Sequence, residues 1–182
     1  MKKPLDRIPI KKVDPSLKTF PGLFGGGCTS ALCSDECCDL GCDVDAASLE
    51  IILQYSEVVE PLIKAAIEEC FATPLIKDND YVGGAYRSTM VRDSDSRCAF
   101  HLHGGRGCAL FSVWAKKGAP KEIVPTICRI YPATWHRGIL FIDSPLREKC
   151  KCLETPPDNA TLPSIFETQE KEIVALFEIK EK

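Results

Sequence analysis

Cysteine is the residue type in this sequence whose number and spacing point to chemistry. The chain holds eleven cysteines in 182 residues, several times the usual content of an intracellular enzyme. Thiols in such number either pair as disulfides or bind a metal ion as thiolates. An odd count prevents complete pairing within one chain, and a chain of this length can bury a sufficient core without disulfides. We therefore favour metal binding over a disulfide scaffold and over reduced thiols that only fill the core.

The first group of cysteines is compact and follows the pattern Cys28-x4-Cys33-x3-Cys37-Cys38-x3-Cys42. Short loops between ligands let several thiolates meet at one centre at a small cost in loop entropy. The intervening residues are mostly small or acidic, so a metal rather than apolar burial would have to organise this loop. The spacing matches neither the paired motifs of zinc fingers nor the regular spacing of bacterial ferredoxins. The pattern predicts an irregular metal-binding loop.

Cys37 and Cys38 are adjacent in this group. Neighbouring side chains diverge by about 100° on a helix and point to opposite faces of a strand. Both thiols can therefore bind one ion only where the backbone is irregular. Otherwise each serves a different centre, or one of them is a packed thiol.

The second group of cysteines is spread along the chain. Cys98 and Cys108 flank a glycine-rich turn at 103–107, which allows both sulfurs to face the same space. Cys128 is followed by Arg129, whose charge would keep a thiol deprotonated and offset the negative charge of a thiolate site. The alternative for Arg129 is an ordinary surface salt bridge.

Several cysteine motifs together carry a resemblance to a known family. They read Cys-Ser-Asp-Glu-Cys-Cys at 33–38, Arg-Cys-Ala-Phe at 97–100, Gly-Cys-Ala-Leu at 107–110, and Pro-Thr-Ile-Cys-Arg-Ile-Tyr-Pro at 125–132. In this combination the chain resembles the YkgJ-type cysteine-cluster family. That family is described as a zinc- or iron-chelating domain and is related to the flagellin lysine N-methylases. Each motif alone is weak, whereas the set is fairly specific.

The resemblance implies a set of metal ligands and a shell around them. The implied ligands are Cys28, Cys33, Cys37, Cys38, Cys98, Cys108 and Cys128. Arg129 and Tyr131 would stand in the shell around the bound metal or cofactor. The sequence departs from the family pattern at Cys42, in the glycine insertion before Cys108, and at Cys150-x-Cys152. The extra cysteines would either complete a second centre or take no part.

Three further residues have both a functional and a structural reading. His101 and His103 would share one face of a strand between two predicted ligands, so they are either additional ligands or surface and structural histidines. Cys70 falls on the inner face of a predicted helix, where a free cysteine is usually a core residue.

The sequence holds no P-loop and no strand followed by GxGxxG, so no nucleotide site is predicted.

The elements that must position these residues are helices and short strands joined by loops. Helical periodicity begins at Ala46, and a second helix with Pro61 in its first turn is predicted to reach Cys70. Strands are predicted at 86–92 and 99–103. A helix at 109–117 should end at Gly118.

The C-terminal part adds three predicted elements. A short helix near 120–127 would deliver Cys128. A hairpin is predicted about His136-Arg137, and an amphipathic helix over 163–178 closes the chain.

These elements predict an α+β fold: a small, loop-rich single domain organised around a cysteine-ligated metal centre, with a closing C-terminal helix. The predicted domain organisation is an extended N-terminal arm over 1–27, the metal-binding domain over 28–155, and a C-terminal helix within 156–182 that packs on the domain.

Overall composition limits the partners. A formal net charge of −3 and a pI near 5.7 favour neither nucleic acid nor an anionic membrane as a partner. No apolar run approaches the roughly 18 residues that indicate a membrane span, and the charged N-terminus lacks the apolar stretch of a signal peptide. We therefore expect a cytoplasmic protein, where disulfides seldom persist.

The expected function is that of a metal-binding protein that holds iron or an iron–sulfur cluster through cysteine thiolates, with a redox or oxidoreductase-like role. The alternative is a zinc-chelating structural or interaction module without catalysis. The expected partners are the metal ion or cluster itself and a protein. The residues leave open whether the chain is an enzyme.

Overall fold

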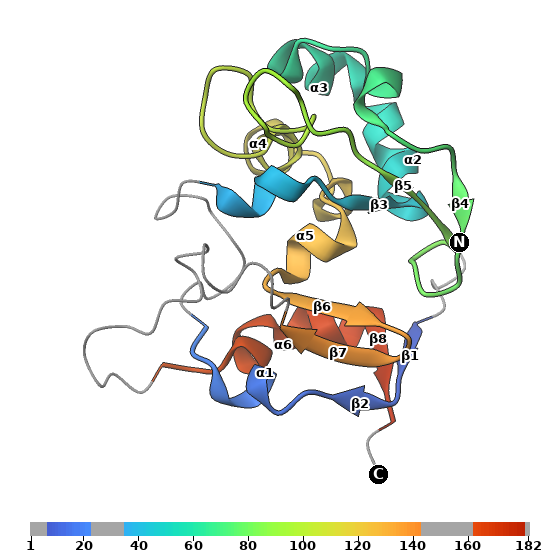
Figure 1. Ribbon diagram of the computed structural model, residues 1–182, viewed down its shortest axis with the longest axis vertical. Coiled ribbons are helices and arrows are strands. Elements are labelled where there is room, and N and C mark those ends of the chain that lie inside the picture. The colour runs from blue at the N-terminus through green and yellow to red at the C-terminus, as the bar shows by residue number, and fades with distance from the viewer. Residues whose placement is uncertain (1–6, 23–34, 143–161, 181–182) are drawn as a thin grey trace. The chain divides into compact units, whose positions relative to one another are not determined.

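The computed structural model describes residues 7–22, 35–142 and 162–180, drawn as coloured ribbon in Figure 1. Both helices and short sheets are present in these residues. The predicted α+β class is therefore confirmed.

Contacts divide the chain into two compact units. One unit, Ser34–Cys128, is called the cysteine unit below. The other, called the terminal unit, comprises Met1–Cys33 and Arg129–Lys182. The predicted boundaries after residues 27 and 155 stay predictions.

The cysteine unit combines short helices with a three-stranded antiparallel sheet of order β3-β5-β4. Figure 1 shows α2 and α3 following one another in this unit, with β4 and β5 nearby. Its elements are η1 (Glu36–Leu40), β3 (Asp43–Asp45), α2 (Ala46–Gln54), α3 (Ser56–Ile63), η2 (Ile67–Cys70), β4 (Ile76–Lys77), β5 (Ala85–Ser88), α4 (Ala109–Lys117), η3 (Lys121–Ile123) and the start of α5 (Thr126–Ile130).

Helix α3 differs from the prediction at both ends. It begins at Ser56, directly after α2, and Pro61 lies inside it rather than in its first turn. At that position proline lacks the amide that would donate to the Glu57 carbonyl, so the helix has one backbone hydrogen bond fewer. The helix stops at Lys64, which adopts a left-handed φ of 57°. A separate 3-10 turn then carries the chain to Cys70.

Helix α4 agrees with its prediction from end to end. It spans Ala109–Lys117 and is closed by Gly118 at a φ of 74°, the left-handed conformation that favours glycine after a helix. The predicted strand over 99–103 is wrong, because only isolated bridges form there. One of them joins His101 to Cys108 across the glycine-rich turn. This turn is too tight for further strand hydrogen bonds to form beside the bridge.

The core of the cysteine unit is apolar and includes two of the cysteines. It is formed by Val44, Ile52, Val59, Ile63, Ile67, Cys70, Phe71, Cys98, Ala99, Phe100, Ala109, Leu110, Val113, Ala119, Ile123 and Val124. Cys38, Cys42, Cys108 and Cys128 are partly buried and pack against this core. The core therefore forms one wall of the region in which these thiols lie.

The terminal unit joins the two ends of the chain. Its elements are β1 (Ile8–Ile10), β2 (Lys12–Val13), α1 (Ser16–Thr19), β6 (Ala133–His136), β7 (Ile139–Ile142), α6 (Ile165–Leu176) and β8 (Phe177–Ile179). Strands β1 and β8 pair in parallel, and β2 pairs in parallel with β7. The N-terminal segment that was predicted as an arm thus contains two paired strands.

Two predicted elements of the terminal unit are confirmed. The hairpin β6–β7 turns at Arg137 and Gly138, both at positive φ, as a two-residue hairpin loop requires. The C-terminal helix forms as α6, and Ser164 and Glu167 cap its start reciprocally. It ends earlier than predicted because Phe177 enters β8.

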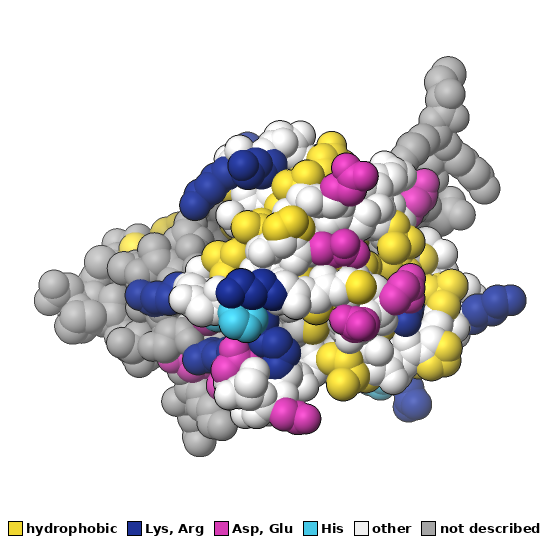
Figure 2. All heavy atoms as spheres, turned by 90° about the horizontal axis from the view of Figure 1, so that it is seen from above, with side chains coloured by type: hydrophobic (Ala, Val, Ile, Leu, Met, Phe, Trp, Pro, Cys, Tyr) yellow, Lys and Arg dark blue, Asp and Glu magenta, His cyan; other side chains and the backbone are white. Residues whose placement is uncertain are grey.

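The surface shows no dominant charge on the face drawn in Figure 2. Acidic, basic and apolar side chains alternate there. Among the described residues, no helix is both long and apolar enough to cross a membrane.

Candidate metal centre

All the described cysteines belong to the cysteine unit, and each carries a free thiol. Two are buried, Cys70 and Cys98, and five are half-buried: Cys37, Cys38, Cys42, Cys108 and Cys128. Two predicted ligands, Cys28 and Cys33, lie outside the described residues, as do Cys150 and Cys152. The geometry below concerns the remaining thiols.

Cys37 and Cys38 lie on the 3-10 helix η1. The chain enters this helix through Asp35, which adopts a left-handed φ of 62° and whose carbonyl oxygen accepts from the Cys38 amide at 2.8 Å. The Cys38 carbonyl in turn accepts from the Cys98 amide at 2.7 Å. These backbone bonds hold the first cysteine group against the second.

Thr89 joins Cys42 to Cys98. Its hydroxyl oxygen accepts from the Cys42 amide at 2.8 Å, and the Cys42 carbonyl accepts from the Thr89 amide at 2.9 Å. The same hydroxyl lies 3.5 Å from the Cys98 sulfur. Thr89 is buried, so one fixed side chain sets the spacing between these two cysteines.

The loop between Cys98 and Cys108 is braced by a buried carboxylate. Asp35 accepts from the Gly107 amide at 2.8 Å and lies 3.1 Å from Nε2 of His101. The other ring nitrogen of His101 lies 3.1 Å from the Leu102 carbonyl oxygen. Both ring nitrogens thus face oxygen atoms, which favours the structural reading of His101.

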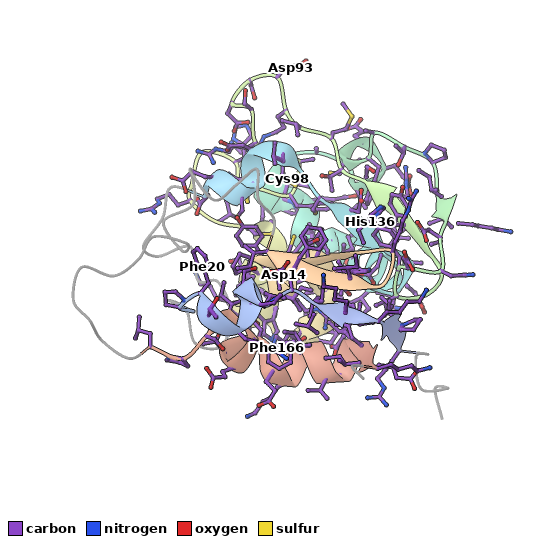
Figure 3. The ribbon with its side chains drawn as sticks, turned by 60° about the horizontal axis from the view of Figure 1, so that its bottom comes forward. Asp14, Phe20, Asp93, Cys98, His136 and Phe166 are labelled. Atoms are coloured by element: carbon purple, nitrogen blue, oxygen red, sulfur yellow. The ribbon has the colours of Figure 1, made fainter. Side chains whose placement is uncertain are left out.

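Figure 3 labels Cys98, where this loop begins, and Asp93, which lies in the loop before it. Asp93 stands at the tip of a protruding loop, and Cys98 lies within the body of the unit. His103, by contrast with His101, is exposed.

Cys128 is positioned through Asp45, at the end of β3. The Asp45 carboxylate caps α2 by accepting from the Ser48 amide at 2.9 Å. It also accepts from the Thr126 amide, the first residue of α5, at 2.9 Å. The carboxylate is buried. It therefore ties the element that follows Cys42 to the helix that carries Cys128.

The thiols themselves form one connected group, called the thiol cluster: Cys37, Cys38, Cys42, Cys98, Cys108 and Cys128. Cys42 shares hydrogen-bonding interactions with the thiols of Cys98 and Cys128. Cys37 and Cys38 interact in the same way. Charge interactions link Cys38 to Cys108 and Cys128, and Cys108 to Cys128 and Cys98. Thiols from four separate stretches of the chain therefore influence one another electrostatically.

The pKa values of these thiols move in both directions. Hydrogen bonding to Cys128 and Cys98, followed by burial, raises the pKa of Cys42 well above its ordinary value. Hydrogen bonding from Cys42 lowers the pKa of Cys98 to about 6, with Thr89 acting in the same direction. In the pair of Cys42 and Cys98, Cys98 is therefore the thiolate and Cys42 keeps its proton and donates it in the hydrogen bond.

Hydrogen bonding and burial also shift the pKa values of other thiols in the cluster. The hydrogen bond between Cys37 and Cys38 lowers the pKa of Cys37 and raises that of Cys38. Burial, followed by the neighbouring charge of Cys128, raises the pKa of Cys108. Cys38, Cys42 and Cys108 are therefore expected to keep their protons at neutral pH.

Cys70 is a residue of the apolar core, although the charge of Cys98 also acts on its thiol. It is 1 % exposed, its thiol lies 3.4 Å from the Ala66 carbonyl oxygen, and burial raises its pKa to about 12. The prediction that Cys70 is a core thiol is confirmed by this packing.

The predicted shell residues belong to the terminal unit. Arg129 lies 3.5 Å from the Glu172 carboxylate, and the Tyr131 carbonyl accepts from the Gln169 amide group at 3.4 Å. A role for Arg129 and Tyr131 beside a metal stays a prediction.

Sequence reasoning missed two residues that position these thiols, and it leaves Cys42 open as either part of a second centre or a bystander. Asp35 and Thr89 gave no local signal, because their roles depend on partners distant in the chain.

Within the described part of the chain, no group of three or more His, Cys, Asp or Glu side chains could hold a metal ion. Comparison of the chain with protein-family models, curated proteins and solved structures yields no match. The resemblance to the YkgJ-type family therefore stays a prediction that rests on its motifs.

Proposed function

We propose that the cysteine unit binds a soft or borderline transition metal through cysteine thiolates, as iron or an iron–sulfur cluster. One observation carries the proposal: the buried Thr89 hydroxyl accepts from the Cys42 amide at 2.8 Å and lies 3.5 Å from the Cys98 sulfur, so cysteines from distant parts of the chain meet at one side chain. Convergence of remote thiols at one point is what a thiolate metal site requires.

Core packing alone does not account for this grouping. A cysteine used as a core residue has the environment of Cys70, which is surrounded by apolar side chains. The half-buried thiols of the cluster instead crowd several ionisable groups together and raise the pKa of Cys42 and Cys108. A bound cation would offset this unfavourable grouping by neutralising the thiolates.

The donor set favours soft metals. Its members are sulfur atoms, which select iron–sulfur clusters, zinc or copper(I) over magnesium and calcium. More thiols gather here than the four that one structural zinc ion takes, which favours an iron–sulfur cluster or more than one ion. When bound, an iron–sulfur centre would supply electron transfer, and the cysteine unit would hold it against the apolar core.

The test is purification of the full chain under anaerobic conditions, followed by metal analysis and visible absorption spectroscopy. We expect iron and acid-labile sulfide, with a broad visible absorption that dithionite bleaches. Cys98→Ser and Cys128→Ser should lose metal, whereas Cys70→Ser should retain it. Stoichiometric zinc in a colourless protein would instead assign the zinc-chelating module. Protein that takes up neither metal would refute the proposal.

A further inference from the structure

We propose that the three-stranded sheet β2-β7-β6 binds a small organic anion in which a carboxylate is joined to an apolar body. The site is a hollow of about 440 Å³ on one face of this sheet, a volume within the range of small-molecule pockets. Residues that line it include Lys12, Asp14, Ser16, His136, Ile139 and Phe141. All of them belong to the terminal unit, so the site is separate from the proposed metal centre.

The two faces of the sheet differ because side chains alternate along each strand. On the inner face, Leu140 of β7 is buried, and Trp135 of β6 packs on Phe177 with ring centroids 5.2 Å apart. Ile139 and Phe141 of β7 point to the other face, called the outer face, which carries the hollow. Ile139 is 41 % exposed there. The outer face therefore presents apolar surface on which the body of a ligand can pack.

The strand register places a basic side chain on each side of Ile139. Ile139 is the partner of Lys12 in β2 and of His136 in β6, so the three side chains form one row across the outer face. Lys12 and His136 are both exposed. An ammonium group and an imidazole that flank an apolar side chain favour a ligand with a carboxylate, which can accept hydrogen bonds from both.

The next row gives the hollow its direction. The Asp14 amide donates to the Leu140 carbonyl at 2.8 Å, which continues the register of β2 and brings Asp14 beside Phe141. The Asp14 carboxylate accepts from the Ser16 amide at 2.9 Å and from the Ser16 hydroxyl at 2.5 Å. Figure 3 labels Asp14 of this row and His136 of the first. Because Asp14 carries a negative charge, the ligand's carboxylate should lie in the basic row and its apolar body should lie on Phe141.

The test is an NMR titration of the isotope-labelled full chain with phenylpropionate, which joins a carboxylate to an aromatic ring. We expect saturable amide shifts that concentrate in β2 and β7. The neutral phenylpropionamide lacks the charge, and inorganic phosphate lacks the apolar body, so each should bind roughly tenfold more weakly or less. Shifts that concentrate elsewhere, or equal affinity for phenylpropionate and its amide or phosphate, would overturn the proposal.

Two lysine variants test the basic row. Lys12→Gln should weaken phenylpropionate binding by roughly tenfold, the cost of losing one charge-assisted hydrogen bond. Lys18→Gln is the matched control and should leave the affinity unchanged, because the Lys18 ammonium lies over the Phe166 ring, 5.8 Å from its centroid. Both lysines are exposed, so neither change should unfold the chain. Absence of binding in wild-type protein, or equal effects of the two variants, would refute the site.

Discussion

Gly41 controls how closely Cys42 approaches Thr89. It adopts a φ of 68°, which costs residues with a Cβ energy. A Cβ on this residue would lie 2.6 Å from the Thr89 hydroxyl oxygen, which is closer than such atoms can approach. The absence of a side chain at Gly41 therefore lets Thr89 bridge Cys42 and Cys98.

At the residue scale, Gly41→Ala should harm both stability and metal binding. Gly104 is the control for positive φ alone, because its φ is 69° and a Cβ there meets no atom within 4 Å, whereas Gly41 also has a ψ of −163°, a region that only glycine adopts readily. Gly104→Ala should lower the free energy of unfolding by about 1 kcal/mol through backbone strain alone. Gly41→Ala should lower it further and should also weaken Co(II) binding. Urea unfolding and cobalt titration measure the two effects, and identical behaviour of the two variants would contradict the role of Gly41.

At the scale of elements, the site depends on buried carboxylates that join one element to another. Asp45 caps α2 and holds the first amide of α5. A helix as short as α5 has little stability of its own, so its place in the cysteine unit depends on this contact. The direction in which Cys128 points follows from the position of that first turn.

Asp45→Ala should therefore cost stability and metal affinity together. Loss of a helix cap costs about 1 kcal/mol, and an unsatisfied buried amide about 1–3 kcal/mol, so we expect a loss of about 3 kcal/mol in the free energy of unfolding. Ser164→Ala removes the cap of α6 in the terminal unit and should cost about 1 kcal/mol without changing Co(II) affinity. Equal cobalt affinities of Asp45→Ala and wild-type protein would refute the positioning role of Asp45.

At the scale of the whole molecule, metal binding is coupled to proton release. A thiol must lose its proton to become a ligand, so metal affinity rises with pH until that thiol is ionised in the unbound protein. The raised pKa values of Cys42 and Cys108 extend this rise through neutral pH. Cys98, with a pKa of about 6, contributes to the rise mainly below neutral pH.

Co(II) affinity of the intact chain should accordingly increase between about pH 7 and pH 8 by roughly tenfold for each proton that Cys42 and Cys108 release. Cobalt affinity measured against a competing chelator over this range tests the prediction. Cys70→Ser should show the same slope, since Cys70 is a core thiol and not a predicted ligand. An affinity that does not change with pH would show that these thiols are not ligands.

The sequence by itself determined the features that depend on composition and on local conformation. The excess of cysteine, the helix that ends at Gly118 and a hairpin in this region could all be predicted, although the hairpin was placed about His136-Arg137 and turns one residue later, at Arg137 and Gly138. Each depends on residues close together in the chain. A glycine that follows a helix or closes a hairpin turn acts through its own φ, whatever the rest of the fold does.

Only the tertiary structure decided which cysteines meet. Cys37 and Cys42 look equivalent in sequence, yet Cys42 faces Cys98 and Cys128 while Cys37 faces Cys38. The Thr89 contact that selects Cys42 spans 47 positions, and the Asp35 contact with Gly107 spans 72. Spacing along the chain cannot determine such contacts, because the direction of each side chain is set by how distant elements pack on a shared core.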